Sequence, residues 1–294
     1  LPILIQESRK LGGAEAKDRR AKPTLGRILW LLLPMWGMLA YDVAAMVCRV
    51  AGWQRRSAML EIAALLVSLV CVIVTLRAED RGPEHRREDL IEFRKVLCAH
   101  SFSWVGVQAM FVYMIAFVQQ RFPVLDAAQG GKLLSTAFFV LSLVAAVLPS
   151  TVLAPLARRY GTIKVHTVCI ASMAGAYLLA YLAAYSTASV YGVMALAGIG
   201  WAAIVSLPFA IMSQRVDESQ IGLYMGIFNL SVVLPQLVAS LGIGLLLTAL
   251  PDKGAVFLVA AGSLAISAFA WLFVRRDEEP TAPQSFQSAG TSHA

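Results

Sequence analysis

Charged side chains are scarce in this sequence. Of its 294 residues, only 15% are Asp, Glu, Lys or Arg, whereas 58% are hydrophobic. A soluble domain carries about a quarter charged residues. The charges also gather in short patches between long apolar runs, so the chain is not expected to fold as a soluble globular protein. The pattern predicts a polytopic integral membrane protein.

Catalytic and metal-binding signatures are also missing. The sequence has no HExxH, no GxSxG and no glycine-rich phosphate loop, and its four cysteines have no CxxC spacing. The cysteines lie in or beside apolar runs, where a thiol is most simply a small apolar side chain. We therefore expect no enzyme activity, no bound metal and no cofactor.

The net charge of +7 is the one feature that could indicate a nucleic-acid partner. Membrane proteins carry a similar excess, because Lys and Arg are enriched on their cytoplasmic loops. In a chain this apolar the second explanation is favoured. The expected partner is the lipid bilayer and not a nucleic acid.

Eight apolar runs are long enough to be spanning helices, because a helix needs about 20 residues to cross a hydrocarbon core of ~30 Å. They cover about residues 28–50, 57–76, 99–120, 133–156, 165–185, 190–212, 221–250 and 255–274. The predicted fold class is therefore all-α, a bundle of eight transmembrane helices. A basic segment at 1–27 precedes them, and a tail at 277–294 rich in Ser, Pro, Gln and Thr is predicted to be disordered.

An even number of spans places both termini on the same side of the membrane. When the loops are assigned alternately to the two sides, nineteen of the 25 Lys and Arg residues fall on the side of the termini. Cytoplasmic loops are the ones enriched in Lys and Arg, so both termini are predicted to be cytoplasmic. The expected location is the plasma membrane or an inner membrane.

The run at 221–250 carries a stripe of small and polar residues on one helical face. Its members recur at helical spacing: Gly222, Gly226, Asn229, Val233, Gln236, Ser240 and Gly244. Either other helices pack closely on this face or it borders a watered path, because lipid favours neither glycine nor amides. Close packing is favoured for Gly222 and Gly226. For Asn229, packing, gating and direct solute contact all stay open.

The same run resembles a known family. It reads Gly222-x-x-Met225-Gly226-x-x-Asn229-x-x-x-Val233-x-Pro235-Gln236, after Gly200-Trp201-Ala202-Ala203 and Leu207-Pro208-Phe209-Ala210. This pattern is similar to the penultimate pair of helices in sucrose-type proton symporters. These form the glycoside-pentoside-hexuronide branch of the major facilitator superfamily, which includes plant sucrose carriers and animal relatives associated with melanosomes. The motifs cover residues 198–236, and the order of apolar runs extends the match over 100–276.

The resemblance implies a twelve-span carrier in which the present runs are spans five to twelve. Residues 99–276 would form its C-terminal half, 28–76 the end of its N-terminal half, and 77–98 the central cytoplasmic loop. The alternating charges of 77–95 suggest a solvated surface helix in that loop. Four further spans would precede Leu1, which is not an initiator methionine. In such a fold each half holds two inverted three-helix repeats, and solute binds near the midplane between the halves.

The resemblance also implies transport of a sugar or glycoside, coupled to protons. Aromatic rings and amides suit a sugar, because they provide stacking surfaces and groups that both donate and accept hydrogen bonds. The candidate solute-binding residues are Trp104, Gln108, Tyr113, Asn229 and Gln236. Trp104, Gln108 and Phe111 share a helical face. The alternative for these three is a buried cluster whose polar tips are satisfied internally.

The last six runs contain no Asp or Glu, so a titrating carboxylate must lie elsewhere. Asp42 and Arg49 lie two helical turns apart on one face of the first run. An ionisable side chain in a membrane is a functional candidate by default, because it costs about 2.5–3.5 kcal/mol to insert. Asp42 is the predicted proton-coupling residue with Arg49 as its charge partner, and a purely structural pair is the alternative. His100 and His166 lie at predicted span mouths and are expected to be interfacial.

Arg158, Arg159 and Gly161 stand in the basic turn between the second and third of the last six runs. This turn is similar to the corresponding cytoplasmic loop of a major-facilitator half. The resemblance implies that its basic residues hold the inward-closed state. A topology signal without a gating role is the alternative.

Two other functions stay open from the sequence. One is an exporter of another small organic solute. The other is a non-transporting assembly factor or scaffold built on a transporter fold. A carrier is expected to line its cavity with charged or amide residues, which a scaffold can lack.

Overall fold

The structure is a computed structural model that describes residues 24–52, 58–79, 85–214, 216, 220–244, 247 and 250–275. Within these ranges the chain is helical and has no strand, so the all-α prediction is confirmed. In this described part of the chain, six helices are long and apolar enough to cross a membrane, and two shorter apolar helices, Ile62–Leu76 and Ala255–Trp271, coincide with the remaining predicted runs. The predicted tail, and all but the last few residues of the predicted N-terminal segment, lie outside the described residues.

The helices follow the apolar runs in chain order. The first two runs form α2 (Leu25–Leu31), the short 3-10 turn η1 (Leu33–Met35), α3 (Trp36–Val50) and α4 (Ala58–Leu76). The last six runs form α5 (His85–Arg121), α6 (Ala127–Leu148), α8 (Thr162–Ala183), α9 (Thr187–Ser213), α10 (Ile221–Val238) and α12 (Ala255–Trp271). The π-helical turns η2 (Pro149–Leu153) and η4 (Ala239–Ile243) extend α6 and α10, and α7 (Ala154–Tyr160) follows η2.

Local sequence signals set several of these helix ends. Asp126 and Gln129 form a capping box at the start of α6: the Asp126 carboxylate accepts from the Gln129 amide at 2.8 Å, and the Gln129 side chain accepts from the Asp126 amide at 3.1 Å. Ser186 and Ser189 form the same arrangement before α9. Gly161 separates α7 from α8 with φ = +87°, a conformation that side chains other than glycine adopt only under strain.

Both π-helical turns lie beside a proline. Pro149 is the first residue of η2, and Pro235 precedes the start of η4 by one helical turn. A proline has no N–H to donate to the carbonyl four residues earlier, and its ring crowds that carbonyl. Local widening to i→i+5 hydrogen bonding is one way in which a helix accommodates such a residue. Both α6 and α10 therefore change geometry within their spans.

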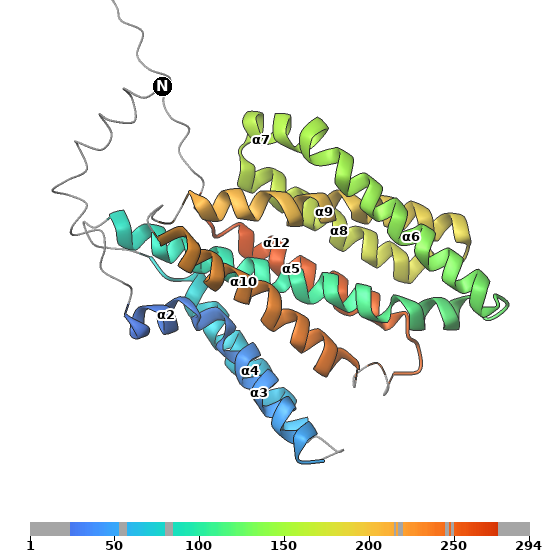
Figure 1. Cartoon of the computed structure of the whole chain (residues 1–294), viewed down its shortest axis with the longest axis horizontal. Coiled ribbons are helices and arrows are strands. Elements are labelled where there is room, and N and C mark those ends of the chain that lie inside the picture. The colour runs from blue at the N-terminus through green and yellow to red at the C-terminus, as the bar shows by residue number, and fades with distance from the viewer. Residues whose placement is uncertain are drawn as a thin grey trace, which may run out of the picture.

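The last six helices pack as a row of neighbours. α10 packs on α5, α5 on α12, α12 on α8, α8 on α9 and α9 on α6, as Figure 1 shows. α3 and α4 lie side by side and meet this bundle at α5 and α10. Direct contacts of α5 with α9 and α6 are few. Long side chains are thus needed to link α5 with α9 and α6.

Glycines lie where these helices cross most closely. A Cβ added at Gly106 would lie 2.8 Å from the Ala260 carbonyl oxygen of α12. On α9, a Cβ at Gly198 would meet α6 at 2.7 Å, and one at Gly200 would lie 2.4 Å from the Cβ of Met173 on α8. Small residues let helix backbones approach within a membrane, where packing and not apolar burial drives association.

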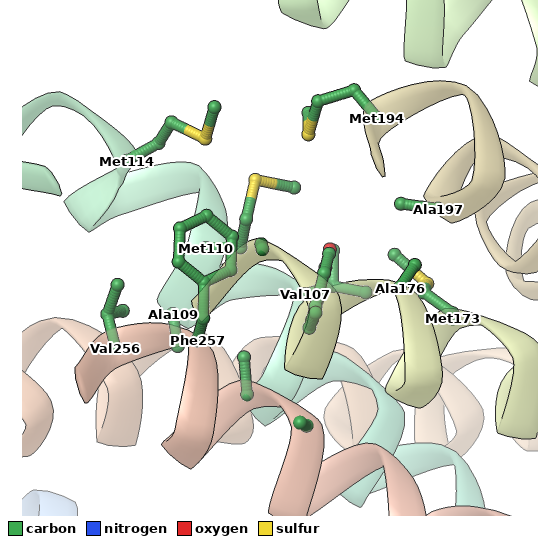
Figure 2. Close-up of a cluster of buried hydrophobic side chains, with 14 of the residues drawn as sticks. Val107, Ala109, Met110, Met114, Met173, Ala176, Met194, Ala197, Val256 and Phe257 are labelled. Carbon is green, nitrogen blue, oxygen red and sulfur yellow. The ribbon is translucent and has the colours of Figure 1, made fainter. Parts of the chain in front are cut away.

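The core between α5, α8, α9 and α12 is rich in methionine. Figure 2 shows Met110 beside the ring of Phe257 and Met114, Met194 and Met173 in the same cluster, and all five side chains are almost completely buried. Methionine is flexible and fills irregular gaps between helices. This part of the bundle is lined mainly by apolar side chains, with the buried ring of Tyr177 packed on Phe257 at 5.7 Å.

The predicted solvated helix at 77–95 is wrong from Leu90 onward. α5 begins at His85, and Leu90, Phe93 and Leu97 are buried. Arg94 is also buried, with its guanidinium carbon 4.1 Å from the centroid of the Trp30 ring. The Arg94 side chain therefore packs against α2, and Lys95 pairs with Glu92 of its own helix at 2.8 Å.

Candidate functional site

A continuous row of aromatic rings crosses four helices of the bundle. In order of contact it comprises Phe228 of α10, His100 and Trp104 of α5, Trp201 of α9, Phe111 of α5 and Phe138 of α6. The centroids of successive rings lie between 4.7 and 6.2 Å apart, the usual range for aromatic pairs. We call this set the aromatic row. It links α5 to α9 and α6, where direct helix contact is sparse.

Trp104, Gln108 and Phe111 lie on one side of α5, as their spacing predicts, and each is half-buried. The ring of Trp201 stands nearly perpendicular to both Trp104 (82°) and Phe111 (79°). Neighbouring rings therefore fix these aromatic side chains while part of each surface stays open. An amide lies between two aromatic positions on the same helical face.

His100 lies between Phe228 and Trp104 in this row. The indole Nε1 of Trp104 donates a hydrogen bond to Nε2 of His100 at 2.9 Å, one helical turn away. The imidazole stacks on Phe228 with a centroid distance of 4.7 Å and an interplanar angle of 15°. His100 is 2% exposed and His166 0%. Both histidines are thus buried inside the protein. For His100 the predicted place at a span mouth is wrong, because α5 extends well before the predicted start of its span, whereas His166 does lie near the start of α8.

Tyr113 lies away from Trp104. The two residues are nine positions apart on α5, which at about 100° per residue places them on opposite sides. The Tyr113 hydroxyl donates to the carbonyl oxygens of Ala239 at 3.1 Å and Ser240 at 3.3 Å, both in η4. The structure thus brings Trp104 and Gln108 together but separates Tyr113 from them.

Two glycines in and beside η4 allow two tyrosine hydroxyls to approach the backbone of this turn. A Cβ at Gly242 would lie 2.6 Å from the hydroxyl oxygen of Tyr41 on α3, and one at Gly244 would lie 2.6 Å from that of Tyr113 on α5. The π-helical turn is therefore held from two sides. Only glycine leaves room for both tyrosine hydroxyls at these positions.

The predicted stripe on α10 is largely open. Asn229 is exposed and Gln236 is partly exposed. No described atom lies within 4 Å of a Cβ placed at Gly222 or Gly226, so the structure does not show the close packing predicted there. Two contacts align α10 with α5: Phe228 stacks on His100, and the Ala239 carbonyl accepts from Tyr113. Gln236 and Gln108 each lie between these two contacts, so they are at about the same height along the two helices.

Asp42 and Arg49 do not pair. Asp42 is 5% exposed, and neither of its carboxylate oxygens has a hydrogen-bond partner among the described residues. Arg49 is exposed near the end of α3, and no ion pair joins the two side chains in this part of the chain. The expected charge partner is therefore absent from Asp42, which is buried in a helix long and apolar enough to span a membrane.

Arg158 and Arg159 occupy the last turn of α7 and are exposed, with Gly161 ending that helix. Basic side chains at a helix C-terminus are favoured by the helix dipole. The Arg159 guanidinium lies over the Tyr160 ring at 5.2 Å. Within the described ranges neither arginine forms an ion pair with a carboxylate.

Sequence reasoning missed Trp201, Phe138 and His100 as members of this site. Trp201 carried a usable signal, since it lies in a segment that matched the family motif. Its contacts with Trp104 and Phe111 join helices about 90 residues apart in the chain, and one sequence does not reveal such pairing. No group of three or more His, Cys, Asp or Glu that could hold a metal occurs among the described residues.

Comparisons with known proteins agree with this architecture. The family model of the Major Facilitator Superfamily matches residues 36–240. A similar solved structure is described as a bacterial homologue of the iron transporter ferroportin in the outward-facing state. The two chains share 13% sequence identity with a TM-score of 0.51, and the alignment covers 84% of this chain and 82% of the other. At that identity the likeness shows a common fold alone. A comparison with curated proteins finds no match.

Proposed function

The chain belongs to the major facilitator superfamily, and from that premise we propose that it carries a sugar or glycoside across the membrane by proton-coupled alternating access. It is an integral membrane transporter, as its spanning helices and fold indicate. The observation that carries the choice of solute is the aromatic row. There, Trp104, Trp201 and Phe111 hold one another edge-on while staying half-buried beside Gln108.

The chemistry of the row suits a sugar ring. A sugar has an apolar C–H face that packs on aromatic rings and a rim of hydroxyls that donate and accept hydrogen bonds. Gln108 supplies an amide on α5, while Gln236 and Asn229 supply two more on the open side of α10. The resemblance to sucrose-type symporters supports the same class of solute.

Alternating access in this fold moves two halves around a site near the membrane midplane. We assign residues 99–276 to the C-terminal half and residues 28–76 to the end of the N-terminal half. The aromatic row would then form one wall of the solute site. Tyr113, on the opposite side of α5, would not contact the solute. It would stabilise the η4 turn, because its hydroxyl lies within hydrogen-bond distance of two carbonyl oxygens there.

Asp42 is the proposed proton-coupling residue. Its carboxylate is buried in a spanning helix without a described hydrogen-bond partner. Ionised groups are costly in that environment, so such a side chain can exchange protons as its access to water changes. Arg49 is the proposed counter-charge in another conformation of the carrier.

Both termini are proposed to be cytoplasmic in a plasma or inner membrane, because nineteen of the 25 basic residues fall on that side. The exposed turn with Arg158, Arg159 and Gly161 would then face the cytoplasm and act in gating. A reporter fused after Ala294 should be cytoplasmic, and a tag inserted beside Lys253 should be reachable from outside. Cytoplasmic labelling at Lys253 would invalidate this orientation.

The direct test is uptake of radiolabelled sucrose by proteoliposomes that contain the full-length protein, with and without an imposed pH gradient. We expect gradient-dependent uptake that falls at least about tenfold in Trp104→Leu, because one ring of the wall is removed. Trp36→Leu is the matched control, since Trp36 is 44% exposed on α3 and outside the row. Equal loss in both variants, or no uptake of sucrose or maltose, would count against a sugar carrier.

Proton coupling is tested separately with Asp42→Asn. We expect the variant to lose the dependence of uptake on the pH gradient, because an amide cannot exchange the proton. Asp252→Asn is the control, as Asp252 lies in the connection before α12 with a half-exposed side chain. A wild-type pH response in Asp42→Asn would move the coupling site elsewhere. Sucrose movement opposite to the proton gradient would favour an exporter.

A further inference from the structure

The hydrogen bond between Trp104 and His100 fixes the chemical form of the imidazole. An indole N–H can only donate, so Nε2 of His100 must be the acceptor in the 2.9 Å bond. A neutral imidazole with an accepting Nε2 carries its proton on Nδ1. Nδ1 of His100 is buried and has no hydrogen-bond partner among the described residues. Among the described residues, the hydrogen bond that Nε2 accepts from Trp104 is therefore the one that the His100 ring makes.

The imidazole is also held rigidly. It lies parallel to Phe228 of α10 and is 2% exposed. The backbone on either side of His100 is anchored to α12, because Ser267 donates to the Ala99 carbonyl at 2.7 Å and Ser263 donates to the Phe102 carbonyl at 2.7 Å. A side chain packed and anchored in this way is suited to orient a neighbour.

Trp104 is the member of the aromatic row that His100 controls. Its indole is half-buried, and it contacts Trp201 edge-on at 5.7 Å and 82°. Without the His100 acceptor, the ring could rotate about its side-chain bonds, since its open side imposes no constraint. The bond and the Trp201 contact together define one orientation.

We propose that His100 is a positioning residue for solute binding: it holds the indole of Trp104 in the orientation that the sugar ring meets. This inference rests on the proposed function of the aromatic row. The role requires a hydrogen-bond acceptor at this position and does not require an ionisable group. His100 is thus distinct from the proposed proton-coupling carboxylate of Asp42.

The requirement for an acceptor gives a rescue test. Replacing His100 with Phe keeps an aromatic ring beside Phe228 but removes the acceptor, whereas His100→Gln keeps an amide oxygen that can accept from the indole. His166→Phe is the matched control. His166 is 0% exposed, lies edge-on to Trp271 at 4.5 Å and is not a member of the aromatic row.

Kinetics of sucrose uptake in proteoliposomes form the first arm. In His100→Phe we expect KM to rise about 2- to 12-fold, the effect of one lost hydrogen bond, with Vmax within about twofold of wild type. We expect His100→Gln to restore KM and His166→Phe to leave KM unchanged. In the Trp104→Phe background, His100→Phe should add no further increase. A KM unchanged in His100→Phe, or raised equally in His100→Gln, would overturn the proposal.

The second arm needs no solute. ¹⁵N NMR of the full-length protein in lipid nanodiscs at pH 7 should show His100 protonated at Nδ1 with Nε2 bare, and a Trp104 indole N–H shifted by hydrogen bonding. The indole shift should disappear in His100→Phe and remain in His166→Phe. Protonation at Nε2 in the wild type would refute the positioning role. If no sugar is carried, the proposed function fails, and this comparison still decides whether His100 holds Trp104.

Discussion

Helices α9 and α10 have similar compositions and opposite surroundings. Each is apolar, carries glycines and contains one internal proline, Pro208 or Pro235. On α9, Gly198 and Gly200 lie at crossings with α6 and α8, where a single added carbon would collide with a neighbour, whereas Gly192 has no such neighbour among the described residues. On α10, Gly222 and Gly226 face no described atom within 4 Å. Small residues on a spanning helix therefore do not by themselves identify a packing face.

The polar residues of the two helices show the same contrast. The hydroxyls of Ser206 on α9 and Ser231 on α10 both donate to a carbonyl of their own helix at 2.6 Å, and on α9 the large Trp201 side chain reaches α5. On α10, Asn229 points to the open side. One helix is therefore a structural centre of the bundle, and the other presents a partly polar surface.

Gly200→Leu tests the closed side of this comparison and should have the largest effect. A Cβ at this position would lie 2.4 Å from the Cβ of Met173 and 2.9 Å from the Cys169 carbonyl oxygen. Overpacking of a well-packed core costs about 1–3 kcal/mol or more, and a leucine here must separate α9 from α8. We expect a large drop in thermal stability of the detergent-solubilised protein. A melting temperature within about 2 °C of that of the wild type would contradict the close approach of α9 to α8 at Gly200.

Trp201→Leu should have the next largest effect, and on binding more than on folding. The substitution removes the ring contacts with Trp104 and Phe111, each worth about 0.5–1.5 kcal/mol beyond burial. We expect KM for sucrose to rise about tenfold, since two such contacts correspond to about that factor. Phe269→Leu is the control, because Phe269 is 58% exposed on α12 and contacts only Phe273 among the described rings. Equal effects of the two variants would remove Trp201 from the site.

Asn229→Ala tests the open side of α10. The amide is exposed, so its removal should not unfold the bundle, while loss of a hydrogen bond to solute would weaken binding about 2- to 12-fold. Binding is measured as the concentration dependence of sucrose uptake, and folding as the melting temperature. Uptake identical to that of the wild type would exclude Asn229 from solute contact.

Gly226→Leu should have the smallest effect on stability. Substitutions without packed neighbours usually change the free energy of unfolding by less than about 0.5 kcal/mol, and no described atom is near this position. Comparison with Gly200→Leu in the same thermal assay isolates the packing at the α8–α9 crossing. Equal destabilisation by the two leucines would show that the stripe of α10 is packed after all.

The all-α membrane fold could be predicted from the sequence, because membrane-spanning helices are recognisable as long apolar runs. Burial within the helices was harder to predict. Leu90, Phe93 and Leu97 recur at the helical spacing of a buried face, but the charges between them suggested a solvated surface. The sequence therefore predicts a start for this span that is too late in the chain, and His100 is predicted at the end of the span instead of inside it.

Contacts between candidate site residues were easier to predict when the residues are close together in the sequence. The shared face of Trp104, Gln108 and Phe111 follows from spacing alone, and the same arithmetic separates Tyr113 from Trp104. The bond from Trp104 to His100 spans one turn and was also within reach. The contacts to Trp201 and Phe138 depend on how α5 meets α9 and α6, which one sequence does not specify.

The π-helical turns η2 and η4 have a consequence for tolerance to deletion. In an α-helix, loss of one residue rotates everything beyond it by about 100° and moves buried side chains to the surface. A π-helical turn contains one residue more than the α-helical turn it replaces, so the same deletion inside it can restore α geometry with the flanking segments in place. Residues 149–153 and 239–243 are therefore the stretches of these two spans where shortening the chain by one residue should be least disruptive.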